Sequence, residues 1–326
     1  MGKTFTGAEK MIRLGAEVNL LICQKSKIQD WRNHFAQHYK YDISAYDLTN
    51  KKQWNDFWEN PCGFRYRVGI INYELAWRRK DLLKLKDFTL MLDESSSIQN
   101  KTAKQTKFIL KLDAANVILL SGTPTSGKYE NLWTQLHLLG WDISERLYQR
   151  QYVNWNTIKI PGGQYVNVVD KENPYKNVDR LKSKMREHGA TFLKTEEVMD
   201  LPEQNFIEMS ISKPKHYDKF MKDSIVTVDG VEMVGDTSLT KRLYARELCG
   251  IYSGAKLEAF RDLISSTNDR IIVFYNFTAE VEKLIRVVQE FERPFSAING
   301  AGKNCLHTKT TAIQLHSCST KLVQKG

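Results

Sequence analysis

The sequence predicts an α/β fold that begins with a doubly wound parallel sheet, and two observations support this prediction. Short runs rich in valine, isoleucine and leucine recur between residues 18 and 123. Polar stretches with helical spacing separate these runs. Apolar runs of this length suit strands that are buried on both faces of a parallel sheet. Their alternation with helices is typical of a doubly wound domain.

Five runs are the expected strands. They are VNLLICQ (18–24), DISAYDL (42–48), RVGIINYE (67–74), FTLMLDE (88–94) and ANVILLSGT (115–123). Between them, KIQDWRNHFAQHY (27–39) and KTAKQTKFILKL (101–112) have the spacing of helices. Two further segments alternate around turn residues, and we expect β-hairpins over 155–170 and 225–236.

Polar residues follow two of the expected strands at the point where each strand ends. Asp93 and Glu94 end one strand, and Ser121, Gly122 and Thr123 follow another. Ligands of open α/β sheets bind at the carboxyl ends of the strands. Both groups are therefore expected on the same functional edge.

The first residues predict what the ligand is. MGKT contains the last part of the phosphate-binding pattern G-x-x-x-x-G-K-[ST], with Gly2, Lys3 and Thr4 in place. In that pattern backbone N–H groups cradle phosphate, the lysine reaches the β and γ phosphates, and the hydroxyl binds Mg²⁺. Mg²⁺ takes only one or two carboxylates, which is how Asp93 would hold it. Glu94 would then orient or deprotonate the attacking water.

Length and composition set the broad class. The chain has 326 residues, 41% hydrophobic and 26% charged, which is typical of a globular protein with a real core. We find no apolar run of about 20 residues and no signal-peptide pattern, so we expect a cytoplasmic protein that is neither secreted nor bound to a membrane. Five cysteines without a C-x-x-C pair predict reduced thiols and no disulfide-linked partner. The net charge of +10 favours a polyanionic partner such as DNA.

The order of several short motifs resembles one known family. The acidic box DESS (93–96) is followed by SGTPT (121–125) and ENLW (130–133). Further matching segments are LICQKSKIQDW (21–31), VGIINYELAWRR (68–79), TEEVMDLPEQ (195–204), LYARELCGIYSGAKLEAF (243–260) and DRIIVFYNFTAEVEKL (269–284). Together they resemble the superfamily 2 helicases, specifically the Swi/Snf-type DNA translocases.

The resemblance implies an architecture and an activity. Residues 1–200 would form a RecA-like P-loop NTPase motor lobe, with a helical and hairpin insertion from about residue 141. Residues 201–326 would form an incomplete second RecA-like lobe with a polar tail, in which we expect no strand beyond residue 300. ATP hydrolysis, with Mg²⁺, would drive movement on duplex DNA.

The resemblance also implies roles for the candidate residues. Lys3, Asp93 and Glu94 would be catalytic; Gly2, Lys3 and Thr4 would bind ATP; Thr4 and Asp93 would bind Mg²⁺. Ser121, Gly122 and Thr123 would couple hydrolysis to movement. Lys25, Lys27, Arg78 and Arg79 would contact DNA phosphates with little sequence preference. Trp31 and Trp133 are expected in the core.

Two departures from the family lead to further expectations. The box reads D-E-S-S rather than D-E-A-H or D-E-A-D. After FERPFSAING (291–300) no Q-x-x-x-R-x-x-R pattern follows, and the family's arginine finger belongs there. We therefore expect a fragment cut at both ends and a poor ATPase.

Two further classes of function stay open at this point. The chain could be a non-catalytic DNA-binding remnant of such a motor, or a different P-loop enzyme such as a nucleotide kinase. DNA-stimulated ATP hydrolysis separates these classes. The hairpin over 155–170 is either a surface decoration or an element that flanks the DNA path.

Overall fold

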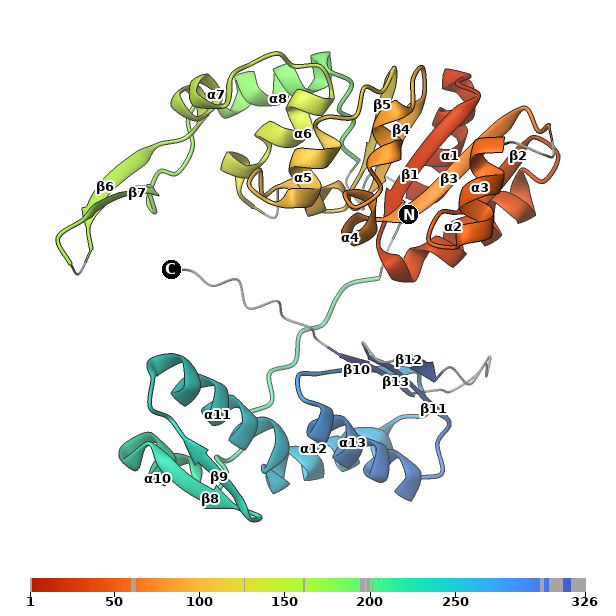
Figure 1. The fold of residues 1–326 in the computed structure, drawn as a ribbon. Helices are drawn as coiled ribbons and strands as arrows, with labels where there is room; N and C mark the ends of the chain where they lie inside the picture. The colour runs from red at the N-terminus through yellow and green to blue at the C-terminus, as the bar shows by residue number, and fades with distance from the viewer. Residues whose placement is uncertain are drawn as a thin grey trace. The chain divides into compact units, whose positions relative to one another are not determined.

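The structure, a computed structural model, divides into two compact units, Met1–Pro202 and Glu203–Gly326 (Figure 1). It describes residues 2–59, 63–125, 127–160, 162–193, 197, 200, 202–299, 302–304 and 313–317. Half of the matching segment 195–204 lies outside these residues. Within the described ranges, no helix is long and apolar enough to cross a membrane.

The first unit is built on a five-stranded sheet in which every neighbouring pair is parallel. Its strands are β1 (Val18–Cys23), β2 (Ile43–Asp47), β3 (Tyr66–Asn72), β4 (Thr89–Asp93) and β5 (Asn116–Leu120). They lie in the order β2-β3-β1-β4-β5, so β1 is central and the chain winds outward from it in both directions. All five predicted strands and the doubly wound topology are confirmed.

Helices cover both faces of this sheet because its strands are apolar on both sides. The helices are α1 (Lys3–Leu14), α2 (Ile28–His38), α3 (Lys51–Glu59), α4 (Tyr73–Ala76) and α5 (Lys104–Ile109). In β1, Leu21 and Cys23 pack with α1 and α2, while Leu20 and Ile22 pack on the opposite face with α3, α4 and α5. None of these four side chains is exposed.

Helix α5 is shorter than the segment 101–112 that the spacing predicts. The Asn100 side chain accepts the Thr102 N–H at 3.0 Å and forms a turn there. Asparagine competes with the helical hydrogen bonds in this way, so the helix begins only at Lys104.

A helical subdomain follows the sheet and carries the first hairpin. It comprises α6 (Trp133–Leu138), α7 (Glu145–Tyr152), β6 (Trp155–Lys159), β7 (Tyr165–Val169) and α8 (Val178–Glu187). Leu136, Tyr148 and Leu181 belong to a hydrophobic cluster of its own. Ser144 caps α7 by accepting the Leu147 N–H at 3.3 Å. The antiparallel hairpin confirms the alternation predicted over 155–170, and it extends away from the helices (Figure 1).

The second unit begins with α10 (Tyr217–Asp223), the hairpin β8 (Ile225–Val228) and β9 (Val231–Val234), and α11 (Ser238–Ile251). The predicted hairpin over 225–236 is confirmed. Helices α12 (Gly254–Ser266) and α13 (Thr278–Glu290) then pack on a second sheet. Its strands are β10 (Ile271–Tyr275), β11 (Phe295–Asn299), β12 (Gly302–Asn304) and β13 (Ile313–Ser317), in the order β10-β13-β11-β12.

The expectation of no strand beyond residue 300 is wrong. β13 pairs in parallel with both β10 and β11, and β12 pairs antiparallel with β11. Ile313 and Leu315 provide only a short alternation within a polar stretch. A strand that receives hydrogen bonds from two neighbours is stabilised by that pairing, and local composition does not reveal it.

Candidate functional site

Lys3 and Glu94 meet at the carboxyl edge of the first sheet. Lys3 Nζ donates to Glu94 Oε1 at 2.7 Å, although the residues are 91 positions apart. Gly122 lies beside the same ammonium, since a Cβ built on it would be 3.7 Å from Lys3 Nζ. The structure thus brings together the start of α1, the end of β4 and the segment after β5.

The backbone of Glu94 is unusual for a residue with a side chain. Its φ of 55° and ψ of 59° lie in the left-handed region. Such a conformation costs a non-glycine residue about 1–2 kcal/mol. The buried hydroxyl of Tyr73 donates to the carbonyl oxygens of Asp93 at 2.9 Å and Glu94 at 3.4 Å. Tyr73 therefore helps to hold the strained turn after β4.

Asp93 is held by a residue that the sequence analysis placed only in the core. The indole Nε1 of Trp31 donates to Asp93 Oδ2 at 2.9 Å, and the Trp31 side chain is buried as expected. Burial raises the pKa of the neighbouring Cys23 thiol to about 12, with the charge of Asp93 adding to the effect. The Asp93 side chain itself is half-buried at the end of β4.

A chain of hydrogen bonds joins the acidic box to the segment after β5. Ser95, in the third position of the box, is buried and donates to Gln135 Oε1 at 2.8 Å. Gln135 Nε2 donates to the Pro124 carbonyl at 2.8 Å, and Gln99 Nε2 donates to the same oxygen at 2.7 Å. Ser121 Oγ accepts the Thr123 N–H at 3.1 Å within the segment itself. The serine that replaces alanine in the box therefore has a partner.

The four basic candidates differ in their surroundings. Lys25 and Arg78 are exposed and have no ion-pair or hydrogen-bond partner for their side chains among the described residues, and the Arg78 guanidinium lies 5.2 Å from the ring centre of Trp77. Lys27 pairs with Asp30 at 3.0 Å. The Arg79 guanidinium lies 4.8 Å from the ring centre of Trp54, and its Nε is buried with no hydrogen-bond partner in the described ranges. Lys25 and Arg78 follow the adjacent strands β1 and β3, so they are the pair available to a ligand.

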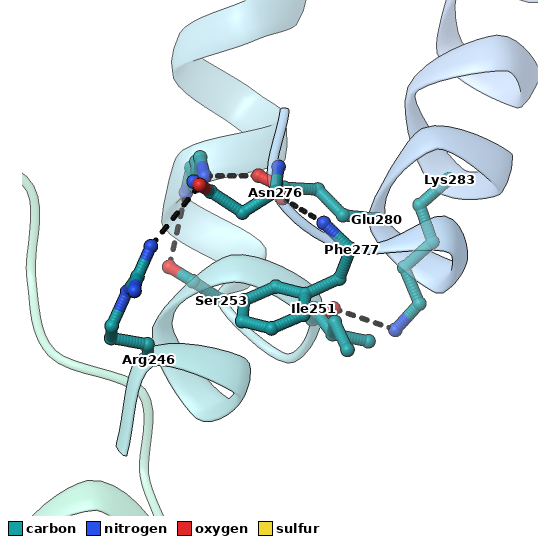
Figure 2. A network of polar contacts seen from close by, with 8 residues as sticks. Arg246, Ile251, Ser253, Asn276, Phe277, Glu280 and Lys283 are labelled. Atoms are coloured by element: carbon teal, nitrogen blue, oxygen red, sulfur yellow. Dashed lines mark hydrogen bonds and ion pairs between the residues drawn. The ribbon is translucent and has the colours of Figure 1, made fainter. Parts of the chain in front are cut away.

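A second polar network lies in the other unit, where the buried carboxylate of Glu280 is the centre (Figure 2). It accepts the N–H groups of Asn276 at 2.9 Å and Phe277 at 3.3 Å, and it pairs with Lys256. Arg246 Nη2 donates to Asn276 Oδ1 at 3.1 Å. The network ties α11, α12 and α13 to the end of β10.

The described cysteines are free thiols, and the described residues contain no cluster that could bind a metal ion. Cys23 and Cys249 are free thiols, and the other three cysteines lie outside the described residues. In the part of the chain that the structure describes, no group of three or more His, Cys, Asp or Glu side chains could hold a metal ion.

Comparison with known proteins identifies the family. The model of the SNF2-related domain matches residues 5–249. The chain belongs to the SNF2-related domain family. The predicted resemblance is therefore confirmed, and this SNF2-related domain is a helicase-like domain of superfamily 2 in a family of ATP-using enzymes.

Several relatives of the SNF2-related domain are similar at low identity. The putative ATP-dependent helicase/translocase YwqA of Bacillus subtilis is 23% identical over 319 residues, which are 94% of this chain and 31% of the relative. The ISWI chromatin-remodeling complex ATPase ISW1 of Saccharomyces cerevisiae is 20% identical over 305 residues, 83% of this chain and 26% of the relative. The chain thus spans less than a third of the length of either protein. The SWI2/SNF2 ATPase core of Sulfolobus solfataricus in complex with dsDNA matches with a TM-score of 0.48 and 14% identity, over 97% of this chain and 71% of that one.

The site of this SNF2-related domain also contains residues to which sequence reasoning assigned no role. Trp31 was expected only as core, and Gln99 and Gln135 were not singled out. Tyr73 lies in the segment VGIINYELAWRR (68–79), which is part of the family resemblance, and this segment is the signal that could have indicated Tyr73. The contacts of the two glutamines depend on tertiary packing alone.

Proposed function

We propose that this chain is the motor of an ATP-dependent DNA translocase, which acts on duplex DNA in the cytoplasm. The observation that carries the proposal is the 2.7 Å ion pair between Lys3 and Glu94, beside Asp93 and Gly122. A cation and two carboxylates at one edge of a parallel sheet are the groups that phosphoryl transfer requires. Met1–Pro202 is then the first motor lobe, and Glu203–Gly326 contributes to the second.

Gly2, Lys3 and Thr4 would bind the phosphates of ATP. Gly2 has a φ of 59°, a conformation that favours glycine, and α1 begins at the next residue. The first N–H groups of a helix have no acceptor within it, and they suit a phosphate oxygen. Lys3 would leave Glu94 and pair with the β and γ phosphates.

The residues present fit Mg²⁺, which uses few protein ligands. Mg²⁺ keeps several waters and binds through one or two carboxylates together with substrate phosphates. Asp93 presents Oδ2 to Trp31, and Oδ1 has no hydrogen-bond partner among the described residues. Asp93 and the Thr4 hydroxyl would hold the ion, and bound Mg²⁺ would neutralise charge on the phosphates.

Glu94 would act on the water that attacks the γ phosphate. In the structure its carboxylate pairs with Lys3. When Lys3 pairs with phosphate instead, Glu94 becomes free to accept a hydrogen bond from water. Binding of ATP would therefore prepare the base for hydrolysis.

Ser121, Gly122 and Thr123 would transmit the state of the site. Gly122 lies next to Lys3, and the following Pro124 carbonyl is held by Gln99 and Gln135. A movement of Lys3 would therefore shift the segment after β5, which hydrogen bonds connect to the acidic box.

Duplex DNA would bind near the same edge through its phosphates. Lys25 and Arg78 are the exposed candidates without an ion pair in the described part of the edge, whereas Lys27 pairs with Asp30 and Arg79 is partly buried over Trp54. Phosphate contacts position a protein on DNA and carry no direct sequence information. The net charge of +10 supports a polyanionic partner.

The test is ATP hydrolysis by the 326-residue chain with and without duplex DNA. Lys3→Ala and Glu94→Gln should each reduce turnover about 10²-fold or more. Asp113→Asn is the control, because Asp113 pairs with Lys86 away from this edge. Binding of ATP and DNA without hydrolysis would instead favour a non-catalytic DNA-binding remnant. Equal activity in Glu94→Gln and wild-type protein would contradict the proposed site.

A further inference from the structure

An open groove of about 640 Å³ lies between α7 and the hairpin β6–β7. Its lining residues come from α7, from the start of β6 and from the chain after β7. They are Arg146, Gln149, Arg150, Val153, Asn154, Trp155, Asn156, Asp170 and Lys176.

The charge of this groove is positive and unbalanced. The side chains of Arg146, Arg150 and Lys176 are exposed, and none has an ion-pair or hydrogen-bond partner in the described ranges. Asp170 is the one carboxylate of the lining. It already accepts the N–H groups of Glu172 at 2.8 Å and Asn173 at 2.9 Å, and the amide of Asn156 at 2.8 Å. Three cations therefore face one carboxylate whose hydrogen-bonding capacity is largely used.

The positions of these cations are fixed by buried neighbours. Arg146 and Arg150 are four residues apart on α7 and so share a face of that helix. Tyr148 and Tyr152 lie on its opposite face and are buried in the helical subdomain. The Lys176 N–H donates to the Tyr152 carbonyl at 3.1 Å, which places Lys176 at the end of α7. The backbone positions of the three cations are therefore fixed close to one another, while their side chains stay exposed and free to contact a ligand.

An exposed aromatic side chain completes the groove. Trp155 is 43% exposed at the first position of β6, although its backbone is paired with Val169. An indole beside unpaired arginines and a lysine matches the combination that single-stranded nucleic acid uses: cations track phosphates and a base stacks on the ring. Paired bases in a duplex interior do not offer a free face for such stacking.

We propose that this groove is a second nucleic-acid site, which binds a single-stranded segment through its phosphates and stacks a base on Trp155. The site is separate from the strand edge that carries Lys25 and Arg78, and it does not depend on ATP. The proposal of a DNA translocase and the proposal of a single-strand site in the groove can therefore be disproved separately.

The experiment measures binding of a labelled 15-nucleotide single strand to the nucleotide-free chain by fluorescence anisotropy. Arg146→Ala with Arg150→Ala should weaken binding roughly tenfold and lower the log–log salt slope by about 1.4, since each contact on a single strand contributes about 0.7. The matched control is Arg180→Ala with Arg186→Ala, two exposed arginines on α8 that do not line the groove. It should bind like wild-type protein.

A second measurement identifies the stacking residue. The single strand should quench tryptophan fluorescence in the wild-type chain, and Trp155→Ala should remove that quenching and weaken binding about tenfold. Trp155→Phe should retain most of the affinity. Equal binding by the groove variant and its α8 control would overturn the proposal. So would displacement of the strand by polyglutamate of the same charge at the same concentration, because the surface would then accept any acidic polymer, including an acidic protein.

Discussion

Trp31 Nε1 donates a hydrogen bond to Asp93 Oδ2 over 2.9 Å and so joins α2 to the end of β4. The contact fixes one oxygen of the carboxylate that we propose as the Mg²⁺ ligand. Trp31→Phe should keep the aromatic packing and remove the donor. We expect the Mg²⁺ concentration required for ATP binding to rise several-fold, with a loss of stability of about 1–2 kcal/mol. Trp133→Phe is the control, because Trp133 donates to Ile143 O instead. An equal Mg²⁺ requirement in both variants would contradict this role.

The ion pair between Lys3 and Glu94 predicts opposite effects on binding and hydrolysis. Glu94→Gln removes the charge that Lys3 must leave before it reaches a phosphate. Nucleotide binding should therefore become tighter by up to about fivefold, since a partly exposed pair contributes at most about 1 kcal/mol. Hydrolysis should be lost. Calorimetric titration with a non-hydrolysable ATP analogue measures the first effect, and weaker binding in the variant would disprove it.

DNA affinity should decrease steeply with salt. Each phosphate contact on duplex DNA contributes about 0.9 to the log–log slope. Lys25→Ala with Arg78→Ala should therefore lower the slope by about 1.8. The control variant is Arg13→Ala with Lys84→Ala. It also removes two positive charges, but these two side chains already pair with Glu9 and Asp81. The control should leave the slope almost unchanged, and an identical reduction in both variants would show that only net charge matters.

The buried thiol of Cys23 predicts alkaline destabilisation. Its pKa rises from 9.0 to about 12 in the folded chain, so the unfolded thiol ionises first. This contribution to stability is fully present below about pH 9 and is lost as the pH approaches 12. Between these values wild-type protein should lose about 1.4 kcal/mol per pH unit more than Cys23→Ala. Urea unfolding at pH 8, 9, 10 and 11 measures the difference, and parallel curves would contradict it.

The carboxylate of Glu280 predicts local stability in the second unit. Glu280→Ala leaves the N–H groups of Asn276 and Phe277 without their acceptor and Lys256 without its partner. We expect a loss of about 3 kcal/mol. Glu290→Ala, on the same helix, removes an exposed pair with Arg261 and should change little. Hydrogen exchange of residues 271–284 should accelerate in Glu280→Ala alone.

Strand-end reasoning predicted the edge of the first sheet well. Lys3, Glu94 and Gly122 come from distant parts of the sequence, and parallel topology brings the ends of β4 and β5 together. The periodicity of the strands was also sufficient to predict their number and the doubly wound class of the sheet. These features depend on patterns that each segment carries by itself.

The supporting contacts could not be predicted in the same way. An indole is apolar enough for the core, so burial of Trp31 was evident while the partner of its N–H was not. Ser95 looked like a departure from the acidic box, and its hydrogen bond to Gln135 depends on where α6 packs. β13 was missed because its stability comes from two neighbouring strands rather than from its own composition.

The placement of β13 has a consequence for how the protein is made. β10 and β11 do not pair with each other, because Ile313–Ser317 lies between them. A ribosome therefore completes all five strands of the first sheet long before it supplies the middle strand of the second. The first unit can fold while synthesis continues, whereas β10 must wait with an open edge for about 40 further residues. During that interval the unpaired strand edge of the nascent second unit is open to pairing with other chains.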